Sequence, residues 1–498
     1  MIFSTNILIE HVMYLGIDLG TSGIKVIIID SMGKLRASET ANLEVSRPKA
    51  LWSEQDPADW WSALALCMQK LQSTHLMSSI KAIGLSGQMH GATLLDSDNA
   101  VIRPAILWND GRCQSQCKEL EYEVKNSRDI TGNIVMPGFT APKIKWVQQN
   151  EPDVFKRINK VMLPKDYLRF LLSGDFASDM SDAAGTMWLD VEKRAWNNAM
   201  LSACGLNQQH MPTLFEGNQI TGYLHQALAQ KWNMSSVPIV AGGGDNAAGA
   251  IGVGLIEPGQ GMISLGTSGV YFVVTDKFTA NPQSAVHSFC HALPNRWHLM
   301  SVMLSAASCL QWFAENVVEQ DLVSILEELE KSDIDTANAP IFLPYLSGER
   351  TPHNNPNATG MFFGLKHQTN KLLMLHAVLE GICFAFADGI DAVHQSGTVA
   401  TEITLIGGGS KSLYWRQMFA DVLGIEINYR EGGDVGPALG AARLAQLAID
   451  PKTPIRDICP QPRVVKTYRP NQQLQKAYAT RRSTFIKLYP SVNALYNG

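Results

Sequence analysis

The pentapeptide Leu-Gly-Thr-Ser-Gly occurs twice in this chain, at residues 19–23 and again at residues 265–269, about half of the 498 residues apart. Apolar runs flank both copies, with Tyr14–Ile17 before the first copy and Ile24–Ile29 after it. Apolar runs of this length on either side of a glycine-containing turn are typical of β-hairpins. Self-similarity at this separation therefore predicts two related units, each with a hairpin whose turn carries Gly, Thr and Ser.

The composition is that of a large, well-buried globular protein. Hydrophobic residues make up 45% of the chain and charged residues 17%, against roughly 25% in a typical soluble chain. The formal net charge is −5 and no run is rich in Lys or Arg, which argues against a nucleic-acid partner and against a membrane partner. The eight cysteines form no Cys-x-x-Cys pair, a pattern typical of free thiols in a reducing cytoplasm.

Strand and helix patterns alternate along the chain, so we expect an α/β protein. Residues 58–71, 372–393 and 436–448 are predicted to be helices. The apolar stretch 297–314 is expected to form a further buried helix rather than a membrane span, because serine, histidine and glutamine interrupt it.

The length predicts two or three domains. The glycine-dense stretch 242–261 is the expected boundary, with one domain over residues 13–254 and a second over residues 255–498. Residues 1–12 lack the features of a signal peptide and precede a second methionine, so we expect a disordered or artefactual extension there.

Three glycine turns have the chemistry of phosphate sites. Successive backbone N–H groups in a Gly-Thr-Ser-Gly turn form a concavity that suits anionic oxygens, although one such turn alone is also an ordinary hairpin turn. A third turn, Gly407–Ser410, follows a predicted strand and precedes a predicted helix, which is a natural place for a nucleotide phosphate. The Walker and Gly-x-Gly-x-x-Gly motifs are absent from the sequence, so any ATP site belongs to another fold.

Two aspartates stand beside these glycines. Asp18 directly precedes the first turn, where it is a candidate Mg²⁺ ligand or a residue that caps its own turn. Asp245 follows three glycines and precedes Asn246, where it is a candidate general base or an ordinary helix N-cap. The segment Gln88-Met89-His90 follows a predicted strand and offers polar contacts for a polyol, with a purely structural histidine as the alternative.

Longer stretches resemble the FGGY family of carbohydrate kinases along nearly the whole chain. They are, in order, GIDLGTSGIKV near the start, LWSEQDPADWW at 51–61, SGQMHGATLLD at 86–96, GFTAPKIKWVQQN at 138–150, AGGGDNAAGAIGVG at 241–254 and LIGGGSKSLYWRQMFAD at 405–421. Leu373 departs from the resemblance, because the family's second motif usually has a polar residue there, which leaves the start of the local helix open.

The resemblance implies an α/β fold of two ribonuclease-H/actin/hexokinase-like domains flanking a deep catalytic cleft. It implies ATP and Mg²⁺ as cofactors, Asp245 as the catalytic base and Asp18 as the metal ligand. Sugar contacts are implied for Gln88, Met89, His90, Asp245 and Asn246. Nucleotide contacts are implied for Gly20, Thr21, Ser22, Gly266, Thr267, Gly407, Gly408 and Gly409.

The Gly-Gln-Met-His-Gly form of the sugar loop, residues 87–91, is similar to that of family members that phosphorylate D-xylulose at O5. This activity is therefore implied, with a small-molecule sugar as the partner. A kinase for another ketose or polyol, such as ribulose or fuculose, is the alternative, and a non-catalytic sugar sensor on the same scaffold is a further one. The resemblance also implies a cytoplasmic location and a homodimer.

Overall fold

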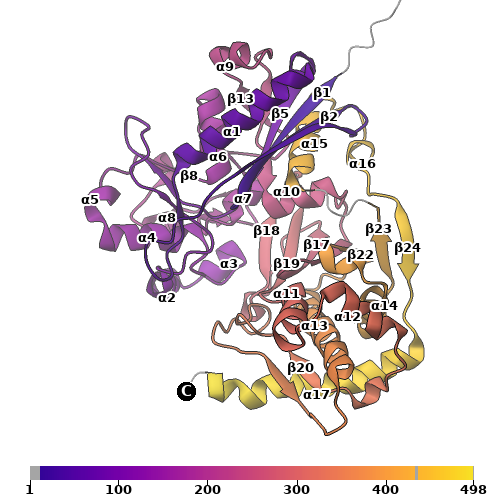
Figure 1. The fold of residues 1–498 in the computed structure, drawn as a ribbon. Helices are drawn as coiled ribbons and strands as arrows, with labels where there is room; N and C mark the ends of the chain where they lie inside the picture. Colours follow the sequence, from indigo (N-terminus) through magenta and orange to yellow (C-terminus); the bar gives the residue numbers. More distant parts are fainter. Residues whose placement is uncertain (1–11, 432–435, 497–498) are drawn as a thin grey trace, which may run out of the picture.

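The computed structural model describes residues 12–431 and 436–496, which form two α/β lobes, one above the other in Figure 1. Each lobe is built on a mixed sheet of seven strands. The first sheet contains β1 (Met13–Leu19), β2 (Gly23–Asp30), β3 (Leu35–Asn42), β5 (Ile80–Gly87), β13 (Ile220–Tyr223), β14 (Pro238–Val240) and β15 (Gly243–Gly244). The second sheet contains β16 (Gln260–Leu265), β17 (Gly269–Thr275), β18 (His287–Cys290), β19 (Trp297–Met303), β22 (Glu402–Ile406), β23 (Ile427–Arg430) and β24 (Val464–Tyr468).

The two sheets share one pattern around the repeated pentapeptide. In the first sheet β1 and β2 pair antiparallel, closing with Leu19 opposite Ile24, and β1 then pairs parallel with β5. In the second sheet β16 and β17 pair antiparallel, closing with Leu265 opposite Gly269, and β16 then pairs parallel with β22. The predicted pair of related α/β units, each with its glycine hairpin, is therefore confirmed.

Helices cover both sheets. Those of the first half are α1 (Pro57–Leu71), α2 (Gln114–Glu123), α3 (Ser127–Thr131), α4 (Thr140–Asn150), α5 (Pro152–Phe155), α6 (Pro164–Ser173), α7 (Met180–Ala184), α8 (Asn198–Ala203), α9 (Gln226–Lys231) and α10 (Asp245–Gly252). Those of the second half are α11 (Ala307–Trp312), α12 (Leu322–Lys331), α13 (Lys371–His394), α14 (Leu413–Leu423), α15 (Pro437–Ile449), α16 (Ile455–Ile458) and α17 (Gln472–Tyr496). Figure 1 shows α2, α4, α5 and α8 gathered at one side of the first lobe and α17 running along the base of the second.

Short strand pairs complete the fold. They are formed by β4 (Glu54–Gln55), β6 (Thr93–Leu95), β7 (Ala105–Ile106), β8 (Lys160–Met162), β9 (Ala177–Asp179), β10 (Leu189–Asp190), β11 (Ala195–Trp196), β12 (Thr213–Phe215), β20 (Ile341–Leu343) and β21 (Met361–Phe363). Residues 1–11, nearly all of the expected extension, lie outside the described residues.

Local capping signals explain where the predicted helices begin. The carboxylate of Asp56 accepts a hydrogen bond from the N–H of Ala58 at the start of α1. Asn370 caps α13 by accepting from the N–H of Leu373, so the apolar residue there does not delay the helix. Of the helices described, α13 alone is long and apolar enough to cross a membrane, and 89% of its most apolar window is buried in the protein, where it forms the core of the second lobe.

The expectation of one helix over residues 297–314 was wrong. The stretch begins as β19, which pairs with β17 on one side and β18 on the other, and it becomes helical only from Ala307, where α11 starts. The two neighbouring strands complete the hydrogen bonds of β19, and its polar side chains, among them His298 and Ser301, are buried. This stabilisation comes from strands distant in the sequence and leaves no local trace in the apolar pattern.

Helices α10 and α15 lie between the lobes (Figure 1). Although α15 comes late in the sequence, it packs on the first sheet, where glycines allow close approach. A Cβ atom on Gly84 would lie 1.9 Å from the carbonyl oxygen of Ala441, and one on Gly16 would lie 2.0 Å from that of Ala438. The packing of α15 on the first sheet therefore crosses the division that we predicted at residue 254.

Candidate active site

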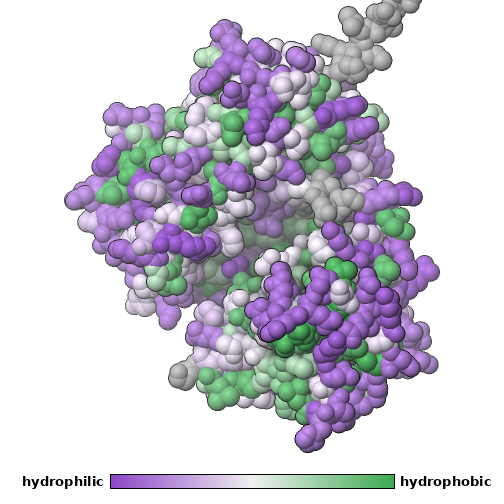
Figure 2. Space-filling view, viewed as in Figure 1, coloured by the Kyte–Doolittle hydropathy of each residue, from purple (hydrophilic) through white to green (hydrophobic). Residues whose placement is uncertain are grey.

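A cavity of about 280 Å³ lies between the lobes, where Figure 2 shows the surface hollowed. The first half of the chain contributes Met89, His90, Trp108, Met136, Gly138, Phe139, Asp245 and Asn246 to its lining. The second half contributes Ser268, Val270, His287, Phe289, Met300, Val302 and Arg350. Four of the five predicted sugar contacts thus come together in one cavity, which we call the sugar cavity.

Asp245 is the first residue of α10, directly after three glycines. Its Oδ1 accepts hydrogen bonds from the backbone N–H of Asn246 at 2.7 Å and from its side-chain Nδ2 at 2.9 Å. Burial raises the pKa of Asp245 to about 6, against the opposing effect of these two hydrogen bonds. A carboxylate in a cavity with a pKa this close to neutrality is well suited to accept a proton from a hydroxyl group.

Asp18 reaches the same edge of the first sheet. It lies opposite Ser86 of β5, and Ser86 lies opposite Gly243 of β15, so three adjacent strands end together directly before Asp245. Burial and, secondly, the negative charge of Asp245 raise the pKa of Asp18 to about 7, whereas Ser86 and Lys25 act to lower it. The two carboxylates are therefore close enough to repel each other.

This pair of aspartates fits a cation. The buried Oδ1 of Asp18 has no hydrogen-bond partner in the described structure, and a positive charge there would relieve its repulsion with Asp245. Among the described residues, no group of three or more His, Cys, Asp and Glu side chains could hold a metal ion. Mg²⁺ at Asp18 would accordingly take most of its ligands from phosphate oxygens and water, as Mg²⁺ commonly does beside a nucleotide.

His90 is held as a neutral imidazole. Its Nδ1 donates a hydrogen bond to the carbonyl oxygen of Gly185 at 2.7 Å, which leaves Nε2 as an acceptor. Burial and the charge of Lys143 lower the pKa of His90 to about 3. The His90 carbonyl oxygen in turn accepts hydrogen bonds from Lys143 Nζ and Thr140 Oγ1, which fix its left-handed backbone, with φ at 67°. The ring can therefore accept a hydrogen bond from a sugar hydroxyl.

Gln88 and the first glycine turn are not part of the lining of the sugar cavity. The Gln88 side chain accepts a hydrogen bond from Thr21 Oγ1 at 3.0 Å and donates one to Gln55 Oε1 at 2.9 Å. Thr21 Oγ1 also accepts from Nε1 of Trp108, a lining residue, at 2.9 Å. Gln88 therefore ties the first turn to the wall of the cavity.

A second cavity of about 500 Å³ lies in the second lobe, and we call it the nucleotide cavity. Its lining includes Gly266, Thr267, Gly408 and Gly409, four of the predicted nucleotide contacts, together with the apolar side chains of Leu265, Leu310, Leu322, Val323, Leu326 and Trp415. Gly407 shapes the turn from outside this lining. Its φ is 89°, and a Cβ atom there would lie 2.6 Å from the carbonyl oxygen of Leu265. Gly20, Thr21 and Ser22 lie outside the lining of both cavities.

Consecutive residues of the second Leu-Gly-Thr-Ser-Gly turn line the two cavities. Gly266 and Thr267 line the nucleotide cavity, and the next residue, Ser268, lines the sugar cavity. A group transferred between the two cavities would therefore pass this turn.

Sequence reasoning missed the part of the sugar cavity that the second lobe supplies. His287 stacks on Phe289, with ring centroids 5.5 Å apart and an interplanar angle of 12°. The Arg350 guanidinium approaches His287 Nε2 at 3.4 Å. We assigned no site residue to the strand and loop that carry these residues, and the docking of the lobes brings them to the sugar cavity beside His90.

Comparison with known proteins extends over nearly the whole chain. The N-terminal domain of the FGGY family of carbohydrate kinases matches residues 13–252, and the family's C-terminal domain matches residues 261–449. A "Xylulose kinase" of Escherichia coli (strain K12) is 57% identical over 477 residues, which are 96% of this chain and 98% of that protein. A "Xylulose kinase" of Klebsiella pneumoniae is 53% identical over 97% of this chain and 100% of that protein.

Solved structures match as well. The crystal structure of a "xyloylose kinase" from Brucella ovis aligns with a TM-score of 0.93 and 47% sequence identity, covering 97% of this chain and 100% of that one. Both family domains and both lobes are thus accounted for, and the chain belongs to the FGGY family of carbohydrate kinases.

Proposed function

We propose that this carbohydrate kinase transfers the γ-phosphoryl group of ATP to O5 of D-xylulose. The observation that carries the proposal is the single glycine turn, Gly266–Ser268, that separates a cavity containing an aspartate from a cavity lined by glycines and apolar side chains. The relatives named xylulose kinase, which are more than half identical over nearly the full chain, support D-xylulose as the acceptor.

In the proposed reaction Asp245 accepts the proton of the terminal hydroxyl group as O5 attacks the γ-phosphorus. The new O5–P bond forms, the bond between the γ-phosphorus and the leaving oxygen of ADP breaks, and the released proton resides on the Asp245 carboxylate. Burial favours this role because it raises the pKa of Asp245 toward neutrality. The neutral His90 accepts a hydrogen bond from another hydroxyl group and orients the sugar.

Asp18 is the residue that would hold Mg²⁺, together with phosphate oxygens and water. When bound, the ion would neutralise the charge that builds up on the phosphates during transfer. Asp18 itself contributes one carboxylate at the end of β1, close enough to Asp245 for their charges to interact. Closure of the lobes around both substrates would exclude water as a competing acceptor.

The proposal is tested by measuring ADP release from Mg²⁺-ATP with D-xylulose, L-ribulose, L-fuculose, glycerol and gluconate. We expect D-xylulose to give the highest kcat/KM, and equal or higher activity with any other sugar would replace it as the acceptor. Asp245→Ala should lower kcat by about 10²–10⁴-fold, the usual contribution of a general base, while the fold persists. An Asp245→Ala enzyme with near-parental turnover would refute the proposed base.

A kinase for another ketose or polyol is the second candidate, because sugars that differ in one hydroxyl configuration are separated only by the hydrogen bonds of the cavity. A cytoplasmic location and a homodimer are proposed on the resemblance to the family. Sedimentation of the purified chain tests the dimer, and fractionation of cells that express it tests the location.

A further inference from the structure

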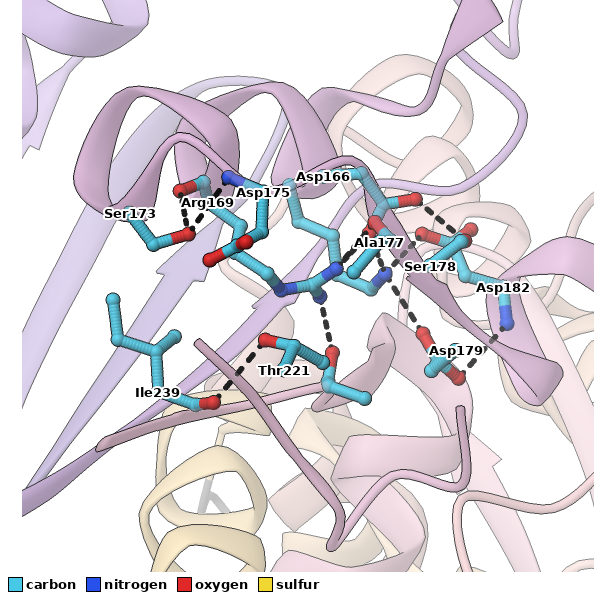
Figure 3. A network of polar contacts seen from close by, with 12 residues as sticks. Asp166, Arg169, Ser173, Asp175, Ala177, Ser178, Asp179, Asp182, Thr221 and Ile239 are labelled. Carbon is cyan, nitrogen blue, oxygen red and sulfur yellow. Dashed lines mark hydrogen bonds and ion pairs between the residues drawn. The ribbon is translucent and has the colours of Figure 1, made fainter. Parts of the chain in front are cut away.

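Beside the sugar cavity the first lobe contains a cluster of buried charges that the proposed reaction does not use. We call it the buried charge network, and it consists of Lys165, Asp166, Arg169, Asp179 and Asp182. Figure 3 labels Asp166, Arg169, Asp179 and Asp182. The side chains come from α6, from the end of β9 and from α7, and all five have no exposure to solvent. Charges buried this completely are costly unless they are paired, so their arrangement calls for a reason.

Lys165 is the centre of the network. Its Nζ lies 2.6 Å from Asp166 Oδ1, 2.7 Å from Asp179 Oδ1 and 3.2 Å from Asp182 Oδ2. Arg169 Nη1 lies 3.0 Å from Asp166 Oδ1 and supplies the second positive charge. Burial raises the pKa of Asp182 well above its usual value, whereas the charge of Lys165 acts to lower it.

The network is connected to the segment that carries Asp245. The Asp179 carboxylate accepts hydrogen bonds from both the N–H and the hydroxyl group of Ser181. Ser181 Oγ in turn accepts a hydrogen bond from the backbone N–H of Gly244 at 3.1 Å. Gly244 is the residue directly before Asp245, so one chain of contacts runs from Lys165 through Asp179 and Ser181 to the backbone of the proposed base.

A second contact fixes the other end of the same segment. Arg169 donates a hydrogen bond to the carbonyl oxygen of Ala241, three residues before Gly244. Between these points the backbone packs closely against Leu85 of β5 and against Met89. A Cβ atom on Gly242 would lie 1.8 Å from the carbonyl oxygen of Leu85, and one on Gly244 would lie 2.9 Å from Met89.

We infer that Ser181, held by Asp179 and Lys165, is a positioning residue that sets the place of Asp245 relative to the reacting hydroxyl group. The inference rests on the proposed role of Asp245 as general base. Displacement of a catalytic group by about 1 Å is enough to lower a reaction rate by about 10²-fold, without any change in the groups that bind substrate. Ser181 is buried and absent from the lining of both cavities, so it acts through Gly244 rather than on a substrate.

The test uses the full chain and compares Ser181→Ala, Ser181→Cys and Ser181→Thr with the parent enzyme. Ser181→Ala removes the hydroxyl group. Ser181→Cys keeps the size of the side chain but offers a weak acceptor, and Ser181→Thr restores a hydroxyl group. We expect kcat to fall about 10- to 100-fold for the first two and to recover in the third, with the KM values for D-xylulose and ATP within about threefold of the parent.

Ser53→Ala is the matched control, because Ser53 is also fully buried and its Oγ has no hydrogen-bond partner in the described structure. It should leave kcat unchanged. An equal fall in kcat for Ser53→Ala, or a fall in kcat for Ser181→Ala that merely follows a loss of folded protein measured by circular dichroism, would overturn the inference. If Ser181→Ala does not fold, the kcat of Ser181→Cys is compared with that of the parent instead.

A double-mutant cycle with Asp245→Asn separates this inference from the proposed function. If Ser181 acts through the base, adding Ser181→Ala to Asp245→Asn lowers kcat by less than about twofold further. A second 10- to 100-fold loss in the double variant would overturn the positioning role and leave the base intact. Near-parental turnover of Asp245→Asn alone would overturn the base, and with it the role of Ser181.

Discussion

Replacement of Lys165 by methionine examines how the buried charge network is stabilised. Methionine fills a similar volume but removes the cation that faces Asp166, Asp179 and Asp182 at 2.6, 2.7 and 3.2 Å. Arg169 still faces Asp166, whereas Asp179 keeps only the hydrogen-bond donors of the α7 turn. Breaking a buried ion pair by removing one partner costs about 3–5 kcal/mol, so we expect Lys165→Met to lower the free energy of unfolding by about this amount at pH 8.

The loss in the free energy of unfolding of Lys165→Met should grow as the pH rises. Burial raises the pKa of Asp182 and the charge of Lys165 acts to lower it, so removal of Lys165 should raise the folded-state pKa of Asp182 further above its value in the unfolded chain. A raised folded-state pKa gives stability that is present at low pH and is lost as the pH rises. For each such carboxyl the difference between variant and parent should therefore shrink by about 1.4 kcal/mol per pH unit as the pH falls below the raised value.

The measurement is urea unfolding followed by tryptophan fluorescence, with parent and variant compared at pH 6, 7 and 8. Lys145→Met is the control, because Lys145 pairs at 2.7 Å with Glu123, whose side chain is 44% exposed and can be solvated instead. We expect the control to lose about 1 kcal/mol or less at every pH. A loss for Lys165→Met below 1 kcal/mol, or one that does not change between pH 6 and pH 8, would refute the reasoning.

Three further predictions concern the two aspartates and the third glycine turn. Because the proposed base must be ionised and burial raises the pKa of Asp245 to about 6, kcat/KM for the sugar should fall as the pH drops through about 6, and a flat profile from pH 5 to 8 would contradict this. Asp18→Asn should raise the Mg²⁺ concentration for half-maximal activity at least about tenfold, since it removes the proposed metal carboxylate, and an unchanged requirement would exclude that role. Gly407→Ala should cost more stability than Gly33→Ala in thermal unfolding. Both glycines have positive φ values, but only a Cβ atom on Gly407 would lie 2.6 Å from the carbonyl oxygen of Leu265. Equal losses of about 1 kcal/mol in the two variants would show that the backbone angle, and not this contact, sets the loss of stability.

Sequence reasoning succeeded where the signal is local. The start of α1 follows from Asp56 and the proline after it, and the two hairpins follow from apolar runs around one pentapeptide. It failed for β19, because strand pairing with β17 and β18 depends on residues far away in the chain. An apolar stretch with scattered serines is compatible with either a buried helix or a buried strand, and only the neighbouring strands decide.

In the candidate active site, too, sequence reasoning found the residues of local motifs and missed those that only tertiary packing brings there. Met89, His90 and Asp245 were predicted to lie at the sugar cavity, and each belongs to a short motif that the fold delivers intact. Gln88 belongs to the same motif as His90, yet its side chain is hydrogen-bonded to Thr21 and Gln55 outside the cavity. The left-handed backbone of His90, with φ at 67°, interrupts the extended run, so the two side chains do not share a direction. Arg350 reaches the cavity only through the docking of the second lobe, a relation that no spacing along the chain records.

We propose an electrostatic reason for the difference between Asp18 and Ser264, the residues that precede the two Leu-Gly-Thr-Ser-Gly turns, and a substitution tests it. Asp18 and Asp245 already repel each other, which contributes to the raised pKa of Asp18. Residues of the second turn line both cavities, so we expect a carboxylate at Ser264, directly before it, to add a third negative charge near the polyphosphate. Ser264→Asp should therefore raise the KM for ATP about tenfold, equivalent to about 1.4 kcal/mol, whereas Ser264→Asn, of the same size but uncharged, should stay within about threefold of the parent. Equal increases for both variants, measured at low ionic strength, would mean that size rather than charge requires a small residue at this strand end.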